Sequence, residues 1–251
     1  MNLSVCIATY NGGNYILQQV QSILNELGPR DEIILVDDCS SDGTVIIVKG
    51  LNDVRIKIYI NNQNRGINYS FERAICLANN DIIFLSDQDD VWLKGRISLM
   101  VNKLLETGAL LLSSNSEFIN KEGKIILYSK DELKEEDSFK YCKNILKIFL
   151  GTTPYYGCAM AFQKKLKDII LPMPSFIESH DLWIAMAGNI IRSSIHLDQK
   201  TLLRRIHDKN ASVIKRRLFP KIWSRFIFAI SFANLFSRNK FFWKNNLSSN
   251  K

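Results

Sequence analysis

The sequence predicts an α/β fold, with a mostly parallel central sheet flanked by helices and followed by a basic, helical C-terminal tail. Three observations favour this fold class. Short β-rich runs alternate with helical patterns through the first half of the chain, the runs are apolar on both faces, and a polar loop follows each of them. Strand–helix alternation of this kind is typical of a parallel sheet that is covered by helices on both faces.

The individual elements follow from hydrophobic spacing. Four runs predict strands, namely LSVCIATY, DEIILVDD, VRIKIYI and DIIFLSD, and the segments between them predict helices, namely NYILQQVQSILNEL, DGTVIIVKGL and NYSFERAICLA. Further along, KGRISLMVNKLLETG and HDLWIAMAGNII predict helices, whereas ALLLSSNSEFI and YYGCAMAFQ predict strands. KIILYS predicts a hairpin return after the turn NKEG, and SIHLDQKTLLRRIH predicts a strand pair or an extended edge. KDELKEEDSFKYCK is charged and irregular, which predicts an exposed loop.

Polar segments follow the four predicted N-terminal strands in succession: TYNGGN, DDCSSDGT, NNQNRG and SDQDD. In open α/β sheets, ligands bind beyond the carboxyl ends of the strands, and parallel strands bring those ends to one edge. We therefore expect the four segments to form a single binding site.

The segment SDQDD carries three carboxylates, those of Asp87, Asp89 and Asp90. Mg²⁺ and Mn²⁺ prefer oxygen ligands, and in nucleotide sites one or two carboxylates and phosphate oxygens hold them. The alternative is a solvated acidic turn in which Asp89 or Asp90 caps the next helix. The three other polar strand ends favour the cation site.

Two further loops offer candidates for nucleotide contact. Asp38, at the end of the second strand, suits ribose hydroxyls or a base N–H, whereas Asp42 and Thr44 suit a turn and a helix cap. Thr9, Tyr10 and Asn11 could meet a nucleobase or ribose, although the loop lacks the G-x-G-x-x-G fingerprint of dinucleotide sites.

Asp181 follows His180 at the start of a predicted helix. A carboxylate with a somewhat raised pKa is a plausible general base, and the alternative is helix capping. The three histidines have no H-x-x-x-H zinc spacing, and we interpret His196 as structural.

Charge is distributed unevenly along the 251 residues. Ten of the 33 basic residues and none of the 25 acidic residues lie from Lys209 onward. Residues 1–208 therefore have a net charge of about −2, although that of the whole chain is +8. The five cysteines are far apart without a C-x-x-C pair, which predicts reduced thiols in the cytosol. The start lacks signal-peptide character, and no apolar run approaches the ~18–20 residues of a membrane span.

The C-terminal tail predicts an amphipathic helix. Its apolar stripe consists of Phe219, Ile222, Trp223, Phe226, Ile227 and Ile230, with Lys221, Ser224 and Arg225 on the opposite face. A basic aromatic helix of this kind can lie on an anionic membrane surface. The alternative is packing on the preceding domain or on a second subunit, which leaves a homodimer open. No nucleic-acid-binding motif is present, so we expect no nucleic-acid partner.

Six segments together resemble the inverting family-two glycosyltransferases of the GT-A fold, a Rossmann-like architecture. They are SVCIATYNGG, EIILVDDCSSDGT, NRGINYSFERA, FLSDQDDVW, GCAMAF and HDLWIA, and their order and spacing match over roughly residues 1–210. The resemblance implies a catalytic domain over 1–210, with a nucleotide-sugar half to about 107 and an acceptor half from 108, followed by the tail at 211–251. The variant SDQDDVW with HDLWIA is most similar to the rhamnosyltransferase-like branch that builds bacterial surface polysaccharides such as O-antigen.

The resemblance implies a role for each candidate residue. The expected nucleotide-sugar contacts are Thr9, Tyr10, Asn11, Asp38, Arg65 and Asp87. Asp89 matches the metal ligand, His207 is a candidate ligand for the metal or a phosphate, and Asp181 matches the catalytic base. Asp90, Trp92 and Trp183 are expected on the acceptor side.

The implied activity is inverting, metal-dependent sugar transfer with Mn²⁺ or Mg²⁺. The best match is L-rhamnose moved from dTDP-rhamnose to a hydroxyl of a growing, lipid-linked glycan, by a cytoplasmic enzyme on the inner face of the membrane. UDP-glucose, UDP-galactose or UDP-N-acetylglucosamine donors remain alternatives, as do a non-catalytic nucleotide-sugar-binding protein and a D-x-D phosphatase. The phosphatase would need a nucleophilic Asp after the first strand, where this chain has ATYNGG.

Two positions depart from the family pattern. Cys39 stands where the family usually has Gly, so the turn after Asp38 could differ slightly, and Ser70 stands in place of Asn.

Overall fold

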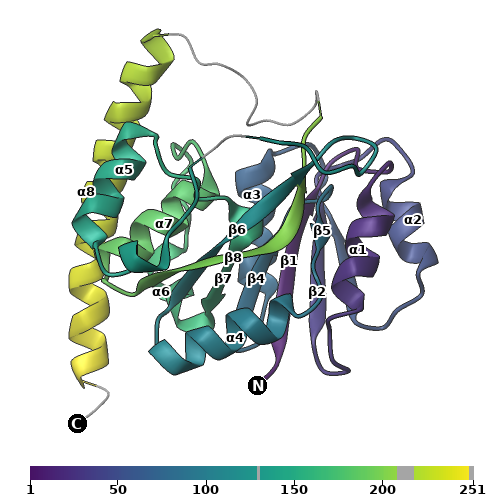
Figure 1. Cartoon of the computed structure of the whole chain (residues 1–251), viewed down its shortest axis with the longest axis horizontal. Helices are drawn as coiled ribbons and strands as arrows, with labels where there is room; N and C mark the ends of the chain where they lie inside the picture. Colours follow the sequence, from purple (N-terminus) through teal and green to yellow (C-terminus); the bar gives the residue numbers. More distant parts are fainter. Residues whose placement is uncertain (129–130, 208–217, 249–251) are drawn as a thin grey trace.

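A computed structural model of the protein describes residues 1–128, 131–207 and 218–248 (Figure 1). Within these residues, eight strands form one sheet in the order β3-β2-β1-β4-β7-β6-β8-β5. The strands are β1 (Leu3–Thr9), β2 (Glu32–Asp37), β3 (Ile56–Ile60), β4 (Ile82–Ser86), β5 (Val91–Trp92), β6 (Leu111–Ile119), β7 (Met160–Gln163) and β8 (Ser194–Arg205). The α-helices are α1 (Ile16–Leu24), α2 (Thr44–Gly50), α3 (Ile67–Leu77), α4 (Arg96–Thr107), α5 (Tyr141–Leu150), α6 (Lys167–Ile170), α7 (His180–Ile190) and α8 (Leu218–Ser248).

The predicted α/β fold is confirmed, and its N-terminal half is the parallel part of the sheet. β1 pairs in parallel with both β2 and β4, and β2 pairs in parallel with β3. Their carboxyl ends therefore meet at one edge, at the top of Figure 1. The four polar loops follow these ends, as the sequence predicts.

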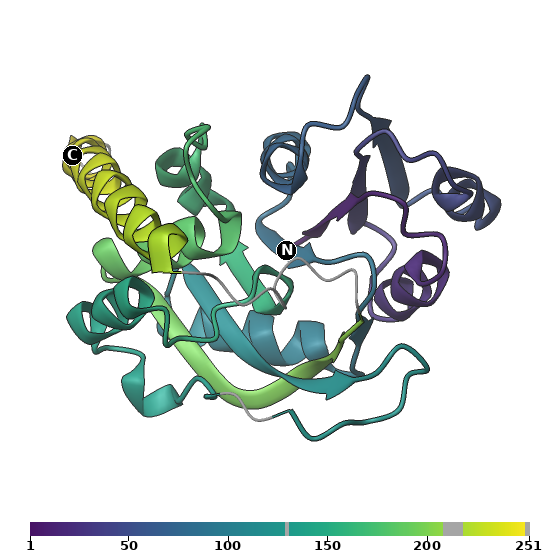
Figure 2. The same cartoon turned by 90° about the horizontal axis from the view of Figure 1, so that it is seen from above.

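The second half of the sheet mixes directions. β7 lies between β4 and β6 and is antiparallel to both, whereas β8 runs parallel to β6 and antiparallel to β5. Figure 2 shows the sheet curled, with β1–β3 on one side of the molecule and α5 and α8 on the other.

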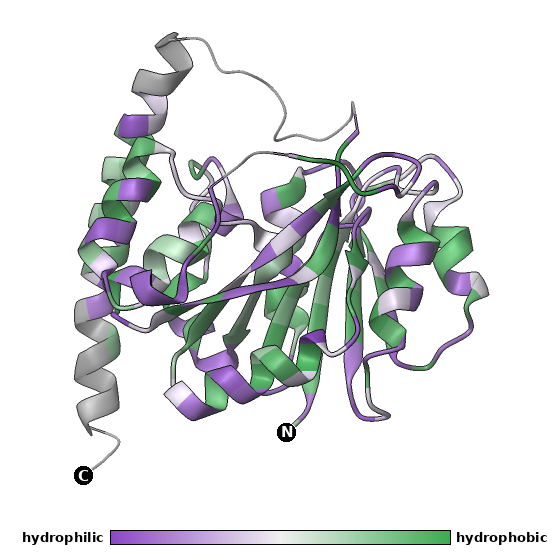
Figure 3. Ribbon diagram, in the orientation of Figure 1, coloured by the Kyte–Doolittle hydropathy of each residue, from purple (hydrophilic) through white to green (hydrophobic). Residues whose placement is uncertain are grey.

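The core has two parts, one on each face of the sheet. Successive residues of β1 divide between them: Val5 and Ile7 pack with α1 and α4, whereas Cys6 and Ala8 pack with α3. The second face is also covered by α6 and α7, with α8 outside them. Apolar residues accordingly line the sheet in Figure 3, while the outer faces of the helices are more polar. This arrangement explains why the buried strands are apolar at consecutive positions.

Three segments differ from the sequence-based expectation. Residues 124–128 do not form a return strand, since only Ile125 bridges to Ile119. Residues 194–205 form one long extended strand with bulges, so only the strand-pair alternative is wrong. The stretch 131–143 is not simply exposed, because Leu133 and Asp137 are buried in it and α5 begins at Tyr141.

Helix α8 packs on the domain through a face that includes, of the described side chains of the predicted stripe, only Ile227. Ser224, Ile227, Ser231 and Leu235 are buried against α6 and α7, whereas Trp223, Phe226 and Ile230 are exposed. The side chains of Phe219 and Ile222 lie outside the described residues. Among the helices that the structure describes, none combines the length and hydropathy that crossing a membrane requires.

Candidate active site

Gln88 joins the loops that follow β1 and β4. Its Oε1 accepts hydrogen bonds from Thr9 Oγ1 at 2.7 Å and from the Tyr10 N–H at 2.8 Å, and its Nε2 donates to the Tyr10 carbonyl at 3.2 Å. Tyr10 itself remains 46% exposed at the loop surface. The ring of Tyr10 is therefore available to a ligand while its backbone is fixed.

The side chains of Asp38 and Asn11 connect the loop after β2 to the neighbouring loops. Asp38 accepts hydrogen bonds from Asn61 Nδ2 and from the N–H groups of Arg65 and Gly66, at 2.7–2.9 Å. Asn11 Oδ1 accepts from the Ser41 N–H at 2.9 Å. Asp38 thus shapes the wall formed by the loop after β3, and these bonds occupy both of its oxygens.

Cys39, which stands where the family usually has Gly, lies in a turn whose backbone conformation glycine favours. Cys39 has φ = 64°, in the left-handed region, and its side chain is exposed. The turn therefore keeps a backbone suited to glycine even though the residue differs. Ser70, the second departure, is buried and accepts a hydrogen bond from Asn61 Nδ2 at 3.0 Å.

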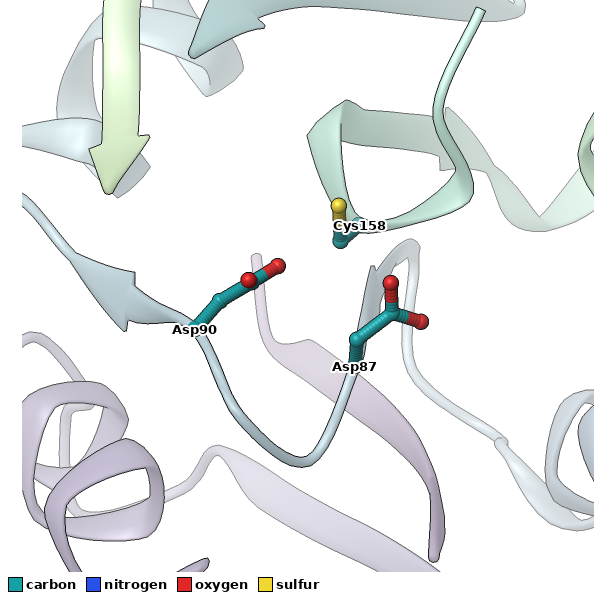
Figure 4. Close-up of side chains that lie close together, drawn as sticks. All are labelled: Asp87, Asp90 and Cys158. Atoms are coloured by element: carbon teal, nitrogen blue, oxygen red, sulfur yellow. The ribbon is translucent and has the colours of Figure 1, made fainter. Parts of the chain in front are cut away.

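The carboxylates after β4 gather against a thiol. Asp87, Asp90 and Cys158 have ligand atoms within 4.8 Å of one another (Figure 4). Burial and the neighbouring Asp89 charge raise the pKa of Asp87, and burial with the Asp89 and Asp87 charges raises the pKa of Asp90 to about 8. Burial also raises the pKa of Cys158 well above its usual value, so this group remains a thiol. A positive charge close to Asp87 and Asp90 would therefore stabilise their ionised forms.

Arg204, near the end of β8, supplies positive charge from within the protein. Its side chain is largely buried. Burial lowers the pKa of Arg204, but the neighbouring Asp90 and Asp87 carboxylates outweigh this effect and raise it above its ordinary value. Its guanidinium carbon lies 3.8 Å from the centroid of the Tyr156 ring. The sequence places Arg204 far from the acidic loop, and the fold brings the two together.

Asp89 points to a different partner. Its Oδ2 lies 2.8 Å from His207 Nε2, and the His207 ring stacks on Tyr15 with 5.2 Å between centroids. Arg205 fixes this backbone, since its Nε donates to the Asp89 carbonyl at 2.9 Å and its N–H donates to Asp90 Oδ1 at 3.0 Å.

A divalent cation fits these residues. Asp90 Oδ2 is buried and accepts no hydrogen bond within the described residues. Asp89 and His207 lie next to each other and could supply one oxygen and one nitrogen ligand. Carboxylate oxygens suit Mg²⁺ and Mn²⁺, and an imidazole nitrogen favours Mn²⁺ because Mg²⁺ takes mainly oxygen ligands. The thiol of Cys158 is a poor ligand for either ion.

Asp181 lies in the first turn of α7, where its Oδ1 accepts a hydrogen bond from the Leu182 N–H at 2.8 Å. Burial raises the pKa of Asp181, and its charge acts on Asp87, so the two carboxylates belong to one electrostatic cluster. Burial lowers the pKa of the adjacent His180 to about 4, and its ring stacks on Phe71 with 4.0 Å between centroids. His180 is therefore a neutral packing residue at neutral pH.

Three other predicted site residues lie away from this cluster. Trp92 and Trp183 are 5% and 2% exposed and pack in the two parts of the core, with Trp183 Nε1 donating to the Ile170 carbonyl. Their burial limits any contact with an acceptor. The guanidinium of Arg65 packs over the ring of Tyr69, with 4.1 Å from its carbon to the centroid.

The sequence interpretation missed Gln88, Arg204, Arg205 and Cys158 as parts of the site. Gln88 stands between two of the acidic residues, and the arginine pair stands at a predicted strand end. Those positions were the only available signals, because the hydrogen bonds and charge contacts of these residues arise from strand pairing distant in sequence.

Comparisons with known proteins show which family the chain resembles. The model of the family "Glycosyl transferase family 2" matches residues 4–170. The UDP-Glc:alpha-D-GlcNAc-diphosphoundecaprenol beta-1,3-glucosyltransferase WfaP of Escherichia coli is 31% identical over 142 residues, which cover 56% of each chain. The dTDP-rhamnosyl transferase RfbG of Shigella flexneri is 28% identical over 220 residues, which cover 81% of this chain and 72% of the relative. Matched regions span only 38–57% of the length of four curated relatives, WfaP among them.

Solved structures show the same fold. S. aureus TarS 1-349 in complex with UDP-GlcNAc has a TM-score of 0.71 at 19% identity, covering 92% of this chain and 66% of that one. The mannosyltransferase PcManGT from Pyrobaculum calidifontis, in complex with GDP-Man and Mn²⁺, has a TM-score of 0.62 at 16% identity, covering 98% and 75%. At these identities the likeness concerns the fold alone.

Proposed function

The chain belongs to glycosyl transferase family 2, and on that premise we propose that it is an inverting glycosyltransferase of bacterial surface polysaccharide synthesis. Its donor is a nucleoside diphosphate sugar and its acceptor a glycan hydroxyl. The observation that carries the proposal is the gathering of Asp87, Asp90 and Asp181 around Arg204 beyond the end of β4, with Asp89 paired to His207 in the same loop.

In the proposed reaction, Asp181 takes the proton from the acceptor hydroxyl as that oxygen attacks the anomeric carbon. A raised pKa suits this role, because the carboxylate then holds the transferred proton more readily. Attack from the face opposite the leaving diphosphate inverts the configuration in one displacement. No covalent sugar–enzyme intermediate is needed, unlike in retaining glycosidases.

The donor is held from the loops after β1, β2 and β4. The exposed ring of Tyr10 can stack on a nucleobase, and Asp87 lies on the side of the ribose and diphosphate. Asp89 and His207 would hold Mn²⁺ or Mg²⁺, which as a Lewis acid neutralises charge on the leaving diphosphate. Arg204 adds fixed positive charge next to the acidic cluster.

Two nucleotide sugars are candidate donors for this site. The resemblance of SDQDDVW and HDLWIA, together with the 220-residue match to the dTDP-rhamnosyl transferase RfbG, supports L-rhamnose from dTDP-rhamnose. The names of the two matched E. coli glucosyltransferases, WfaP and WfgD, support UDP-glucose and a diphosphoundecaprenol-linked acceptor. Both donors share a pyrimidine base, a pentose (deoxyribose in dTDP, ribose in UDP) and the diphosphate, and the loops would bind these common parts.

A lipid-linked acceptor implies contact with the inner membrane face. Trp223, Phe226 and Ile230 of α8 are exposed, and Leu146 and Leu150 of neighbouring α5 are also exposed. Arg225 of α8 adds positive charge beside α5, since its guanidinium donates a hydrogen bond to the Leu150 carbonyl. Exposed aromatic and aliphatic residues beside cations suit the interface of an anionic membrane.

The function is tested by thermal-shift measurements with dTDP-rhamnose, UDP-glucose and UDP-N-acetylglucosamine, with and without Mn²⁺. A bound donor stabilises the folded state, so the cognate nucleotide sugar should raise the melting temperature in a Mn²⁺-dependent manner. Asp89→Asn should abolish the Mn²⁺-dependent part, whereas the exposed Asp168→Asn of α6 should leave it unchanged. If no nucleotide sugar shifted the melting temperature, the proposed function would be wrong.

A further inference from the structure

A second cavity lies beside the acidic cluster, in the half of the chain that follows β5. Its volume is about 130 Å³, and it is bounded by the end of β6, residues 125–128, Tyr156 and Lys200. None of the four strand-end loops contributes to its lining. It is therefore distinct from the site proposed for the nucleotide.

Aromatic rings form one part of the cavity wall. The ring of Phe118 lies 4.7 Å from that of Tyr128 and 6.5 Å from that of Tyr156, measured between centroids. The planes are inclined by 43° and 88°, so the rings meet at angles rather than as one flat stack. Aromatic faces are apolar and carry partial negative charge, which suits the weakly positive C–H groups on one side of a pyranose ring.

Polar side chains complete the wall. Three are carboxylates, those of Glu117, Asp131 and Glu132, and one is the ammonium of Lys200, which lies 3.9 Å from Glu117 and 3.6 Å from Glu132. Carboxylates accept hydrogen bonds from hydroxyl groups, and the ammonium donates them. Three acids against one base repel a phosphate or a uronate, so the lining suits a neutral ligand.

Tyr156 joins this cavity to the acidic cluster. Its ring lies beneath the guanidinium of Arg204, and the charge of Asp181 acts on its hydroxyl, whose pKa burial raises to about 12. The next residue, Gly157, approaches α7 so closely that a Cβ on it would lie 3.4 Å from Asp181 Cβ. The cavity thus adjoins the residue proposed as the base.

We propose that this cavity is a saccharide subsite that binds one neutral sugar ring of the acceptor glycan. Phe118, Tyr128 and Tyr156 offer the apolar faces, and Glu117, Asp131 and Glu132 accept hydrogen bonds from the hydroxyls. The assignment of this sugar to the acceptor rests on the proposed function, whereas saccharide binding itself does not depend on it.

Saturation-transfer NMR on the full chain tests the subsite, with methyl β-D-glucopyranoside and methyl α-L-rhamnopyranoside as probes. Phe118→Ala should weaken binding roughly tenfold, a loss of about 1.4 kcal/mol. Glu132→Gln should also weaken it, and its side chain is 57% exposed, so this variant is expected to fold. Phe139→Ala is the matched control, since Phe139 is 72% exposed and does not line the cavity.

The charge of the lining is tested by the uronate of the same glucoside, which should bind several-fold more weakly than the neutral form. Absence of glycoside binding, binding unchanged in Phe118→Ala and Glu132→Gln, or equal binding of the uronate would each overturn the proposal. Thermal shifts with nucleotide sugars on the same samples separate the two hypotheses. A donor shift without glycoside binding refutes the subsite alone, and glycoside binding without any donor shift refutes the proposed function alone.

Discussion

Asp181 acquires its properties from its surroundings rather than from its position in the sequence. It lies in the first turn of α7, it accepts a backbone hydrogen bond from its own helix, and burial raises its pKa. A helix-capping aspartate on the surface would have a lowered pKa, because the helix N-terminus stabilises negative charge. The environment of Asp181 therefore suits proton transfer better than capping.

The pH dependence of transfer follows from this shift. Protonated Asp181 cannot accept a proton, so the rate should fall at low pH, and the acid limb should lie above the ~3.9 of an ordinary aspartate. Initial rates of nucleotide release at saturating donor would locate this limb. Asp181→Asn should lower the rate by about 10²–10⁴ and keep the melting temperature, because Asn Oδ1 can still accept from the Leu182 N–H. Retention of full activity would exclude Asp181 as the base.

Gly157 controls the position of that base. A Cβ at Gly157 would lie 2.7 Å from His180 Nε2, so Gly157→Ala must displace the buried His180 ring next to Asp181. We expect a fall in turnover of roughly 10²-fold, since small misplacements of a catalytic group are costly. Gly50→Ala is the control, because nothing lies within 4 Å of a Cβ there. Equal turnover in the two variants would show that the spacing between residue 157 and α7 is unimportant.

At the scale of elements, the start of α5 shows how a charged segment becomes ordered. Asp137 is buried, and its carboxylate accepts bonds from Lys140, Lys143 and Lys147 at 2.8, 3.2 and 2.9 Å. These hydrogen bonds hold the pKa of Asp137 well below its usual range. The charged composition of this stretch suggested an exposed loop, whereas the charges are in fact neutralised by one another.

This cluster makes a contribution to stability that depends on pH. Asp137→Asn should reduce the free energy of unfolding by about 1 kcal/mol at neutral pH, since the lysines are half-exposed and water screens each pair. Because the pKa is lowered in the folded state, the contribution is present above the unfolded pKa of ~3.9 and is lost as pH falls below it. Urea unfolding at pH 7 and pH 3 measures the difference. A deficit of equal size at both values would refute the electrostatic explanation.

The elements also show what local sequence can predict. β1, β2 and β4 were predictable because strands buried on both faces are apolar at successive positions. The insertion of β7 between β4 and β6 was not predictable, because pairing distant in sequence leaves no local pattern. The same holds for the site. Acidic candidates stood out in a single loop, whereas Arg204 and Gln88 depend on contacts made by the folded sheet.

At the scale of the molecule, α8 divides its apolar residues between two surfaces. Leu235 is fully buried on the domain, whereas Trp223 and Phe226 are 57% and 55% exposed. The predicted stripe placed Ile227 on one face with Trp223 and Phe226, whereas Ile227 is buried, because spacing alone cannot show which side of a helix meets its own domain. The helix can therefore pack on the domain and present aromatic rings outward at the same time.

Vesicle co-sedimentation separates the two surfaces. Combined Trp223→Ser and Phe226→Ser should weaken binding to phosphatidylglycerol vesicles by roughly tenfold or more and leave the melting temperature unchanged. Ile46→Ser on α2 is the control, since Ile46 is 76% exposed on the nucleotide half. High salt should weaken the wild-type binding further. Equal sedimentation of all three proteins would exclude α8 as the membrane contact.

The pairing of β6 with β8 has a consequence for how the chain folds during synthesis. The region matched by the family ends at residue 170, yet the partner of Leu111 is Ser194 and that of Ile119 is Arg205. A nascent chain that stops at residue 170 would leave one edge of β6 open, and an unpaired strand edge invites aggregation. The sheet can close only after residues 194–205 leave the ribosome. The segment that best identifies the family is thus unable to complete the sheet by itself.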